Sequence, residues 1–257
     1  MSRLEAFAEA APERVARAIG EATNELARRN PAPRDFPFFA LDHPERSGGK
    51  LLDRLSELGI FRFYEHVLDL AHGLGGPARW LARRRGCSVV TVAERIDEAR
   101  ASRLLGERAH LASAVGVLRA VFTRVPAVDA SFTHAWAVES LAGRADLAEV
   151  AAELFRLVRP GGHVAIQDWI AGSADVFSGP LRAAGFSHLR SSVVMDLRET
   201  ESTVAALARA RTEELLGEPA ADEQLRFDAA AERLAERRAA IADGRTALVQ
   251  IFAQKPA

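Results

Sequence analysis

Cysteine is almost absent from this chain, and neither sign of charge prevails. Cys87 is the single cysteine among 257 residues, so an internal disulfide framework and an all-cysteine metal site are excluded. Lysine and arginine number 34 against 35 aspartates and glutamates, which gives a formal net charge of -1. No overall basic field therefore argues for nucleic acid or a membrane surface as the partner, and a small-molecule partner fits better.

Long apolar runs are also missing. No stretch approaches the roughly 20 residues of a membrane-spanning helix, although hydrophobic residues make up 48% of the chain, as in a globular protein. The N-terminal segment carries Glu5, Glu9 and Glu13, so it lacks the basic start and apolar core of a secretion signal. We therefore expect one soluble, cytoplasmic domain over residues 1–257. The sequence leaves its oligomeric state open.

Strand and helix patterns alternate through the middle of the chain. This alternation predicts an α/β fold, a Rossmann-like and mostly parallel sheet with right-handed crossovers and helices on both faces. In such sheets, function lies at the carboxyl ends of the strands. The predicted strands are 66–70, 88–93, 115–122, 132–138, 163–168, 187–197 and 246–253, and the longer helices among them are 96–108 and 146–158.

Helical patterns flank this alternation on both sides. Residues 1–49 predict amphipathic helices followed by a loop rich in proline and glycine, which together could form an N-terminal lid. Residues 198–243 predict a helical insertion of two charged amphipathic helices before the last strand. Four side chains could anchor the loop of the lid over a pocket, namely Phe36, Phe38, Phe39 and His43.

Glycines gather directly after the first predicted strand. Gly73, Gly75 and Gly76 would let the backbone bend tightly and approach a ligand closely, and the next helix would offer free N–H groups. Glu94 ends the second predicted strand, where a carboxylate can accept both ribose hydroxyls of a nucleoside-containing cofactor. A ligand-free strand-to-helix connection and a solvated acid remain the structural alternatives for these two features.

Four segments carry a family resemblance. They read HVLDLAHGLGGPARWLARRRGCSVVTVAER (66–95), VDASFTHAWAVESL (128–141), LFRLVRPGGHVAIQDW (154–169) and ALVQIFAQKP (247–256). Together they resemble the motifs of the class I S-adenosylmethionine-dependent methyltransferases, most closely the small-molecule sarcosine, tocopherol and sterol methyltransferase group. The resemblance implies a seven-stranded sheet with an antiparallel C-terminal strand, S-adenosylmethionine as cofactor and a small-molecule acceptor.

The resemblance also implies cofactor-binding residues, with Glu94 on the ribose, although the motifs depart from the family pattern. Ala71 replaces a glycine and His72 a small cysteine, and no acid follows the third strand, where Val121 or Phe122 would face the adenine. If Ala71 required a positive φ, its Cβ would cost on the order of 1 to 2 kcal/mol. The implied set is Asp69, Ala71, His72, Gly73, Gly75, Glu94, Arg95, Val121, Phe122 and Ala137.

The catalytic candidates are Glu139, Asp168 and His72. The two carboxylates each end a predicted parallel strand, where either could orient an acceptor amine or hydroxyl, or instead cap a loop or helix. His72 could act as a base or turn away into solvent. The histidines show no metal-ligand spacing, so no metal site is predicted, and His134 is expected to be a core residue. Acceptor-pocket candidates, with core packing as the alternative, are Trp136, Trp169 and Tyr64.

Three functions remain open at this point. Methyl transfer to a small molecule is the first hypothesis. The altered motifs leave room for a non-methylating, cyclase-like enzyme on the same fold. They also leave room for a catalytically degenerate subunit or scaffold, which large exposed apolar surface on the late helices would favour.

Overall fold

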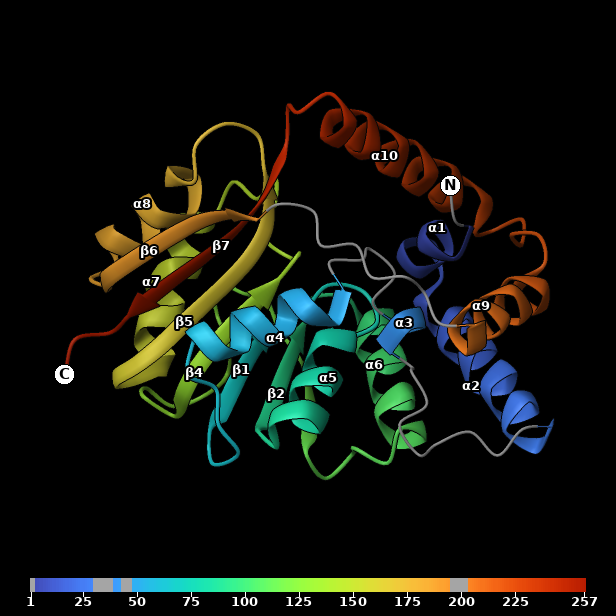
Figure 1. The fold of residues 1–257 in the computed structure, drawn as a ribbon, viewed down its shortest axis with the longest axis horizontal. Helices are drawn as coiled ribbons and strands as arrows, with labels where there is room; N and C mark the ends of the chain where they lie inside the picture. Colours follow the sequence, from blue (N-terminus) through green and yellow to red (C-terminus); the bar gives the residue numbers. More distant parts are fainter. Residues whose placement is uncertain (1–2, 30–38, 43–47, 195–202) are drawn as a thin grey trace.

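A computed structural model describes residues 3–29, 39–42, 48–194 and 203–257. A seven-stranded sheet in the order β3-β2-β1-β4-β5-β7-β6 runs through it (Figure 1). The strands are β1 (His66–Leu70), β2 (Ser88–Ala93), β3 (Val115–Arg119), β4 (Phe132–Val138), β5 (Val158–Ile170), β6 (Ser187–Val194) and β7 (Ala247–Gln254). The helices are α1 (Arg3–Ala10), α2 (Pro12–Arg29), α3 (Phe39–Asp42), α4 (Gly48–Leu58), α5 (Gly76–Arg85), α6 (Ile96–Arg108), α7 (Leu147–Leu157), α8 (Asp175–Ala183), α9 (Thr203–Leu216) and α10 (Gln224–Ala242).

The predicted Rossmann-like fold is confirmed. Strands β3, β2, β1, β4 and β5 pair in parallel, whereas β7 runs antiparallel to both β5 and β6. The β-branched residues of β2 occupy a mostly buried strand between β3 and β1, as their propensity favours. Parallel pairing brings the ends of β1, β2, β4 and β5 to one edge, because Leu70 is in register with both Val92 and Ala137.

β3 and β5 differ most from the predicted ranges, β7 is shifted by one residue, and predicted strand residues 195–197 lie outside the described residues. β3 ends at Arg119, before the predicted residues 120–122. β5 begins at Val158, before the predicted start at residue 163, so Arg159–Gly162 forms an irregular start of the strand. The cause lies in Gly161, which adopts φ 77°, and in the shift of the β4–β5 register beside it. Gly162 also lies so close to the carbonyl of Thr133 that a Cβ would not fit.

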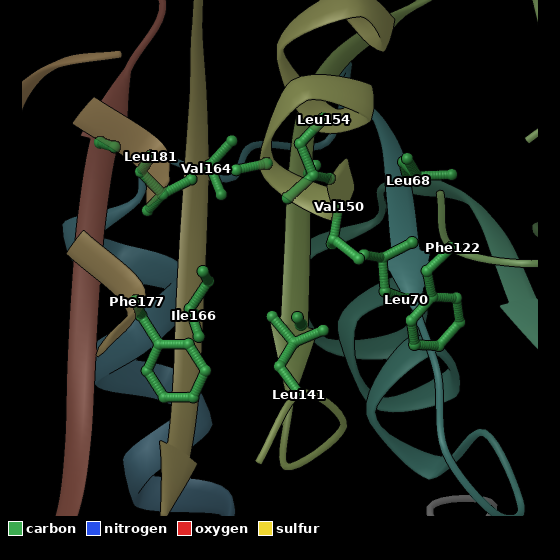
Figure 2. Packing of buried hydrophobic residues seen from close by; sticks show 14 of the residues in the cluster. Leu68, Leu70, Phe122, Leu141, Val150, Leu154, Val164, Ile166, Phe177 and Leu181 are labelled. Carbon is green, nitrogen blue, oxygen red and sulfur yellow. The ribbon is translucent and has the colours of Figure 1, made fainter. Parts of the chain in front are cut away.

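Apolar side chains fill both faces of the sheet. Leu68 and Leu70 of β1 belong to the cluster that Figure 2 shows, where they lie near Val150 and Leu154 of α7, while Phe177 of α8 lies beside Ile166. On the opposite face, Val67 and Trp136 pack against α4 and α5. Trp136 is fully buried there beside Phe61 and Trp80, so it is a core residue and not part of an acceptor pocket. Burial of such aromatic side chains contributes much of the stability of a core.

Helices from the two ends of the chain form an additional helical layer. Figure 1 shows α1, α2, α9 and α10 together beside α6, and buried residues of α1, α2, α6 and α9 share one apolar cluster. Within this layer, Nε of Arg211 on α9 lies 2.7 Å from Oε2 of Glu25 on α2. The lid residues Phe36, Phe38 and His43 lie outside the described residues, as does the side chain of Phe39. No helix in the described part of the chain is long and apolar enough to cross a membrane.

Candidate functional site

The glycine-rich turn joins β1 to α5 at the edge where the parallel strands end. Gly73 and Gly75 adopt φ 75° and 71°, in the left-handed region that glycine tolerates best. Ala71 has no positive φ, so the conformational cost considered for its Cβ does not arise. Its N–H donates to the carbonyl of Val92 at 2.9 Å, which continues the pairing of β1 with β2 into the turn.

The three glycines meet different surroundings. A Cβ at Gly75 would collide with the hydroxyl of Ser102, and one at Gly76 would lie 2.6 Å from Oδ1 of Asp42. Gly75 and Gly76 are therefore required by the packing of the chain itself. A Cβ at Gly73 would meet no atom within 4 Å, so this position has an open side where a ligand could approach the backbone.

A buried ion pair holds the turn in place. Arg79 donates to Oδ2 of Asp42 through Nε at 2.9 Å and through Nη2 at 2.7 Å, and it also reaches the carbonyls of Leu74 and Ser102. Both charged side chains are at most 4% exposed. Because these contacts join α3, the turn, α5 and α6, the pair fixes the backbone that a cofactor would contact.

His72 lies on the turn with a half-exposed side chain. Its Nδ1 is 3.4 Å from Oε1 of Glu98, and the same carboxylate oxygen accepts the N–H of Gly73 at 3.2 Å. Burial raises the pKa of Glu98, and the nearby His72 and Arg95 act against this shift. The arrangement leaves the catalytic role of His72 a prediction, and it adds Glu98 as the residue that orients the ring.

Glu94 lies at the end of β2, as predicted, and is engaged by two groups of the chain. Arg144 donates to Oε2 through Nη1 at 2.7 Å and to Oε1 through Nη2 at 3.1 Å, and the N–H of Phe122 donates to Oε1 at 3.0 Å. Burial favours a higher pKa for Glu94, but these hydrogen bonds outweigh burial and hold the pKa below its usual value. Glu94 is therefore a carboxylate at neutral pH.

The two apolar candidates for adenine contact differ in exposure. Phe122 is 3% exposed and packs in the core under the guanidinium of Arg144, whose Cζ lies 4.7 Å from the ring centroid. Val121 is 52% exposed and has a free apolar surface. Of the two, only Val121 could contact a ligand without a rearrangement of the core.

Glu139, directly after β4, and Asp168, two residues before the end of β5, lie close together. Asp168 is fully buried and accepts the N–H groups of Leu141, Ala142 and Trp169 at 2.6, 3.0 and 2.8 Å. Burial raises the pKa of Asp168 to about 7 against the effect of these hydrogen bonds, and the charge of Glu139 adds to the rise. Asp168 therefore holds the loop after β4, which agrees with the alternative that this carboxylate caps a loop. Of the two carboxylates, Glu139 lies nearer to the surface.

Trp169 supports Glu139 directly. The indole Nε1 donates to Oε2 of Glu139 at 3.2 Å. Glu139 itself has φ 53°, an unusual backbone conformation for a residue with a side chain, and its N–H donates to the carbonyl of Gln167 at 2.7 Å. Such strain is found more often at functional sites than elsewhere, so the geometry is compatible with a role in orienting an acceptor.

The remaining candidates have structural partners. Asp69 is buried and accepts the hydroxyl of Thr91, its register neighbour on β2. Arg95 pairs with Asp97 and donates to the carbonyl of Glu9 at 2.8 Å, which attaches the end of α1 to this edge of the sheet. Ala137 is buried in β4, beside Leu70.

Two further side chains discussed in the sequence analysis, Tyr64 and His134, lie away from the carboxyl ends of the strands. Tyr64 precedes β1 and is exposed there, so it cannot line a pocket at the carboxyl ends of the strands. His134 is a buried core histidine, as expected, with Nδ1 3.1 Å from Glu65 and its ring stacked on His163. In the described part of the chain, no group of three or more histidine, cysteine or acidic side chains could hold a metal ion.

Sequence reasoning missed four residues that shape the site, Asp42, Arg79, Glu98 and Arg144. The helical positions of Arg79 and Glu98, three residues after Gly76 and four after Glu94, were visible in the sequence. Asp42 ends the short helix α3, within a stretch predicted as a loop, and Arg144 lies in the connection between β4 and α7. The sequence pattern does not determine the course of either segment, so no local signal identified their partners.

The chain is similar in sequence to known methyltransferases. Residues 68–166 match the family model of a methyltransferase domain. Over 131 residues, the chain is 33% identical to methyltransferase GfsG of Streptomyces halstedii, an alignment that covers 50% of this chain and 46% of that protein. The chain spans less than half the length of the curated relatives it matches first.

Two solved structures share the fold. Phosphoethanolamine N-methyltransferase 2 of Haemonchus contortus, in complex with S-adenosyl-L-methionine, is similar with a TM-score of 0.64 and 15% identity over 91% of this chain and 60% of that one. The [4+2]-cyclase SpnF is similar with a TM-score of 0.62 and 19% identity over 80% and 81% of the two chains. Identities this low show the fold alone.

Proposed function

Because residues 68–166 match the model of a methyltransferase domain and the sheet has the strand order of the class I S-adenosylmethionine-dependent methyltransferase fold, we propose that the chain transfers a methyl group from S-adenosylmethionine to a small-molecule acceptor. One observation carries the proposal. The turn at Gly73, open on one side, and the carboxylate of Glu94 lie at the ends of the adjacent strands β1 and β2, where Leu70 is in register with Val92. This is the pair of groups that a nucleoside-containing cofactor needs.

The residues fit S-adenosylmethionine in three places. The backbone at Gly73 can approach the methionine end, Glu94 can accept the ribose hydroxyls, and exposed Val121 can cover the adenine. The cofactor would supply a methyl group already activated on a sulfonium. Apolar Val121 provides contact surface for adenine but no hydrogen bond that would select it.

The chain would then act mainly by alignment. Well-oriented reactants can lower a barrier by roughly 7 to 11 kcal/mol, so a dedicated base is dispensable. We propose that Glu139, oriented by Trp169, positions an acceptor amine or hydroxyl. Asp168 would act indirectly, because it holds the loop that follows β4. His72 beside Glu98 is the second candidate to receive a proton.

We extend the proposal to the whole chain of residues 1–257 as one domain. Its helical layer, α1 and α2 with α9 and α10, would cover the acceptor side. A cytoplasmic location would suit the buried thiol of Cys87, whose pKa is raised to about 12 by burial. Nucleic acid and membrane surfaces are not proposed as partners.

The other two functions have no observation in their favour. A cyclase shares the fold, but the aligned sequence relatives are methyltransferases. On the late helices, exposed apolar side chains such as Leu207 and Leu225 occur singly, and scattered residues of this kind are normal on a surface.

The test is acceptor-dependent formation of S-adenosylhomocysteine by the purified chain, with a panel of small amines, alcohols and activated alkenes. Glu94→Gln should weaken cofactor binding by about 1.5 to 3 kcal/mol through loss of a charge-assisted ribose contact. Glu153→Gln is the matched control, since Glu153 also accepts a backbone N–H and an arginine but lies on α7. Equal effects of both changes, or no product with any acceptor, would contradict the proposal.

A further inference from the structure

Arg144 binds the carboxylate that the proposed cofactor needs. It lies in the connection between β4 and α7, 50 residues from Glu94 in sequence, with a side chain that is 19% exposed. Its guanidinium makes two hydrogen bonds to Glu94 and two to Asp146, at 2.8 Å through Nε and 2.7 Å through Nη2. Two carboxylates thus share one arginine.

The hydrogen-bond capacity of Glu94 is nearly used. A carboxylate offers about four lone-pair positions, and Glu94 accepts two N–H groups of Arg144 and one of Phe122. About one position remains, whereas a ribose that donates both hydroxyls needs two. At least one contact of Arg144 to Glu94 must therefore break before the ribose can bind in that way.

Arg144 can give way at low cost because it has other partners. Asp146 would still hold its Nε and Nη2 after the contacts to Glu94 are lost. Phe122 supports the guanidinium from below through its ring face. The side chain of Asp146 is 39% exposed, so an arginine shifted toward it would move toward water and remain solvated.

We propose that Arg144 is a specificity-determining residue of the cofactor site: it competes with the ribose hydroxyls for Glu94, and Asp146 receives it when the cofactor binds. This inference rests on the proposed function. Its consequence is that ligands with two adjacent ribose hydroxyls displace Arg144, whereas a nucleoside that lacks one of them leaves part of the bridge intact.

The experiment is isothermal calorimetry with S-adenosylhomocysteine on the full chain and three variants. Arg144→Met keeps an unbranched side chain and removes the guanidinium that competes for Glu94, so affinity should rise about tenfold or more, the worth of a charge-assisted hydrogen bond. Asp146→Asn removes the charge of the alternative partner, so affinity should fall several-fold. Arg85→Met is the matched control, because Arg85 also bridges two acids, Asp53 and Glu57, with a side chain 22% exposed.

Opposite shifts for Arg144→Met and Asp146→Asn, with Arg85→Met unchanged, are the expected result. Binding only by Arg144→Met would support the inference as well. Affinity that is unchanged or weaker in Arg144→Met while the wild type binds would overturn it and leave the proposed function standing. Should Arg144→Met not fold, an unchanged or higher affinity of Asp146→Asn overturns the inference. Absence of binding by every folded protein would overturn the proposed function itself.

Discussion

Removal of Arg79 should destabilise the protein more than removal of any exposed ion pair. In Arg79→Met, the carboxylate of Asp42 stays buried without its cation, and the carbonyls of Leu74 and Ser102 lose a donor. Breaking a buried pair by removal of one partner costs about 3 to 5 kcal/mol. Affinity for S-adenosylhomocysteine should fall as well, because the pair fixes the turn that contains Gly73.

Equilibrium unfolding in urea measures this effect. Arg84→Met serves as the control, since Arg84 lies on the same helix and pairs with Asp53 with its side chain 61% exposed, and it should cost less than about 1 kcal/mol. The double variant Asp42→Asn with Arg79→Met should cost less than the sum of the single changes, because the buried charge is then gone. A cost for Arg79→Met no larger than that for Arg84→Met would refute the reasoning.

Further predictions concern the turn and the core. Gly73→Ala should cost only the left-handed strain of about 1 to 2 kcal/mol, whereas Gly75→Ala should cost more because its Cβ meets Ser102; urea unfolding of both variants compares them. Ala71→Gly should leave the affinity for S-adenosylhomocysteine within about twofold by calorimetry, since Ala71 has no positive φ to relieve. Burial lowers the pKa of His134 to about 4 against about 6.5 when unfolded, so its contribution to stability, complete above pH 6.5, is lost as pH falls through 4. In His134→Gln, the melting temperature should depend less on pH between these values. A pH profile of the melting temperature that is unchanged from the wild type would contradict this account.

Local sequence patterns predicted the order of strands and helices along the chain. That order in turn predicted where the acidic residues at the strand ends lie. Strand and helix periods placed β1, β2 and β4 at their observed bounds, since each is a short apolar run between clear breaks. Glu94 and Glu139 were then assigned to one edge because parallel strands share a direction. The irregular start of β5 was missed because it depends on contact between Gly162 and β4, which no local pattern reports.

The partners of the site residues were less predictable. Whether Glu94 faces solvent or an arginine depends on the path of the connection that carries Arg144, and long-range ion pairs of this kind leave no periodic trace in the sequence. The same holds for Asp42, which meets Arg79 only because α3 crosses the turn. Asp168 was expected among catalytic groups from its strand position, but its three backbone contacts follow from the loop after β4.

Isothermal calorimetry of the wild-type chain with S-adenosylmethionine tests the central claim most directly. The account predicts saturable binding with a dissociation constant in the micromolar range, equivalent to about -8 kcal/mol. Absence of binding by protein that circular dichroism shows to be folded would contradict it, because the wild-type chain would then not bind the cofactor that the proposed reaction requires.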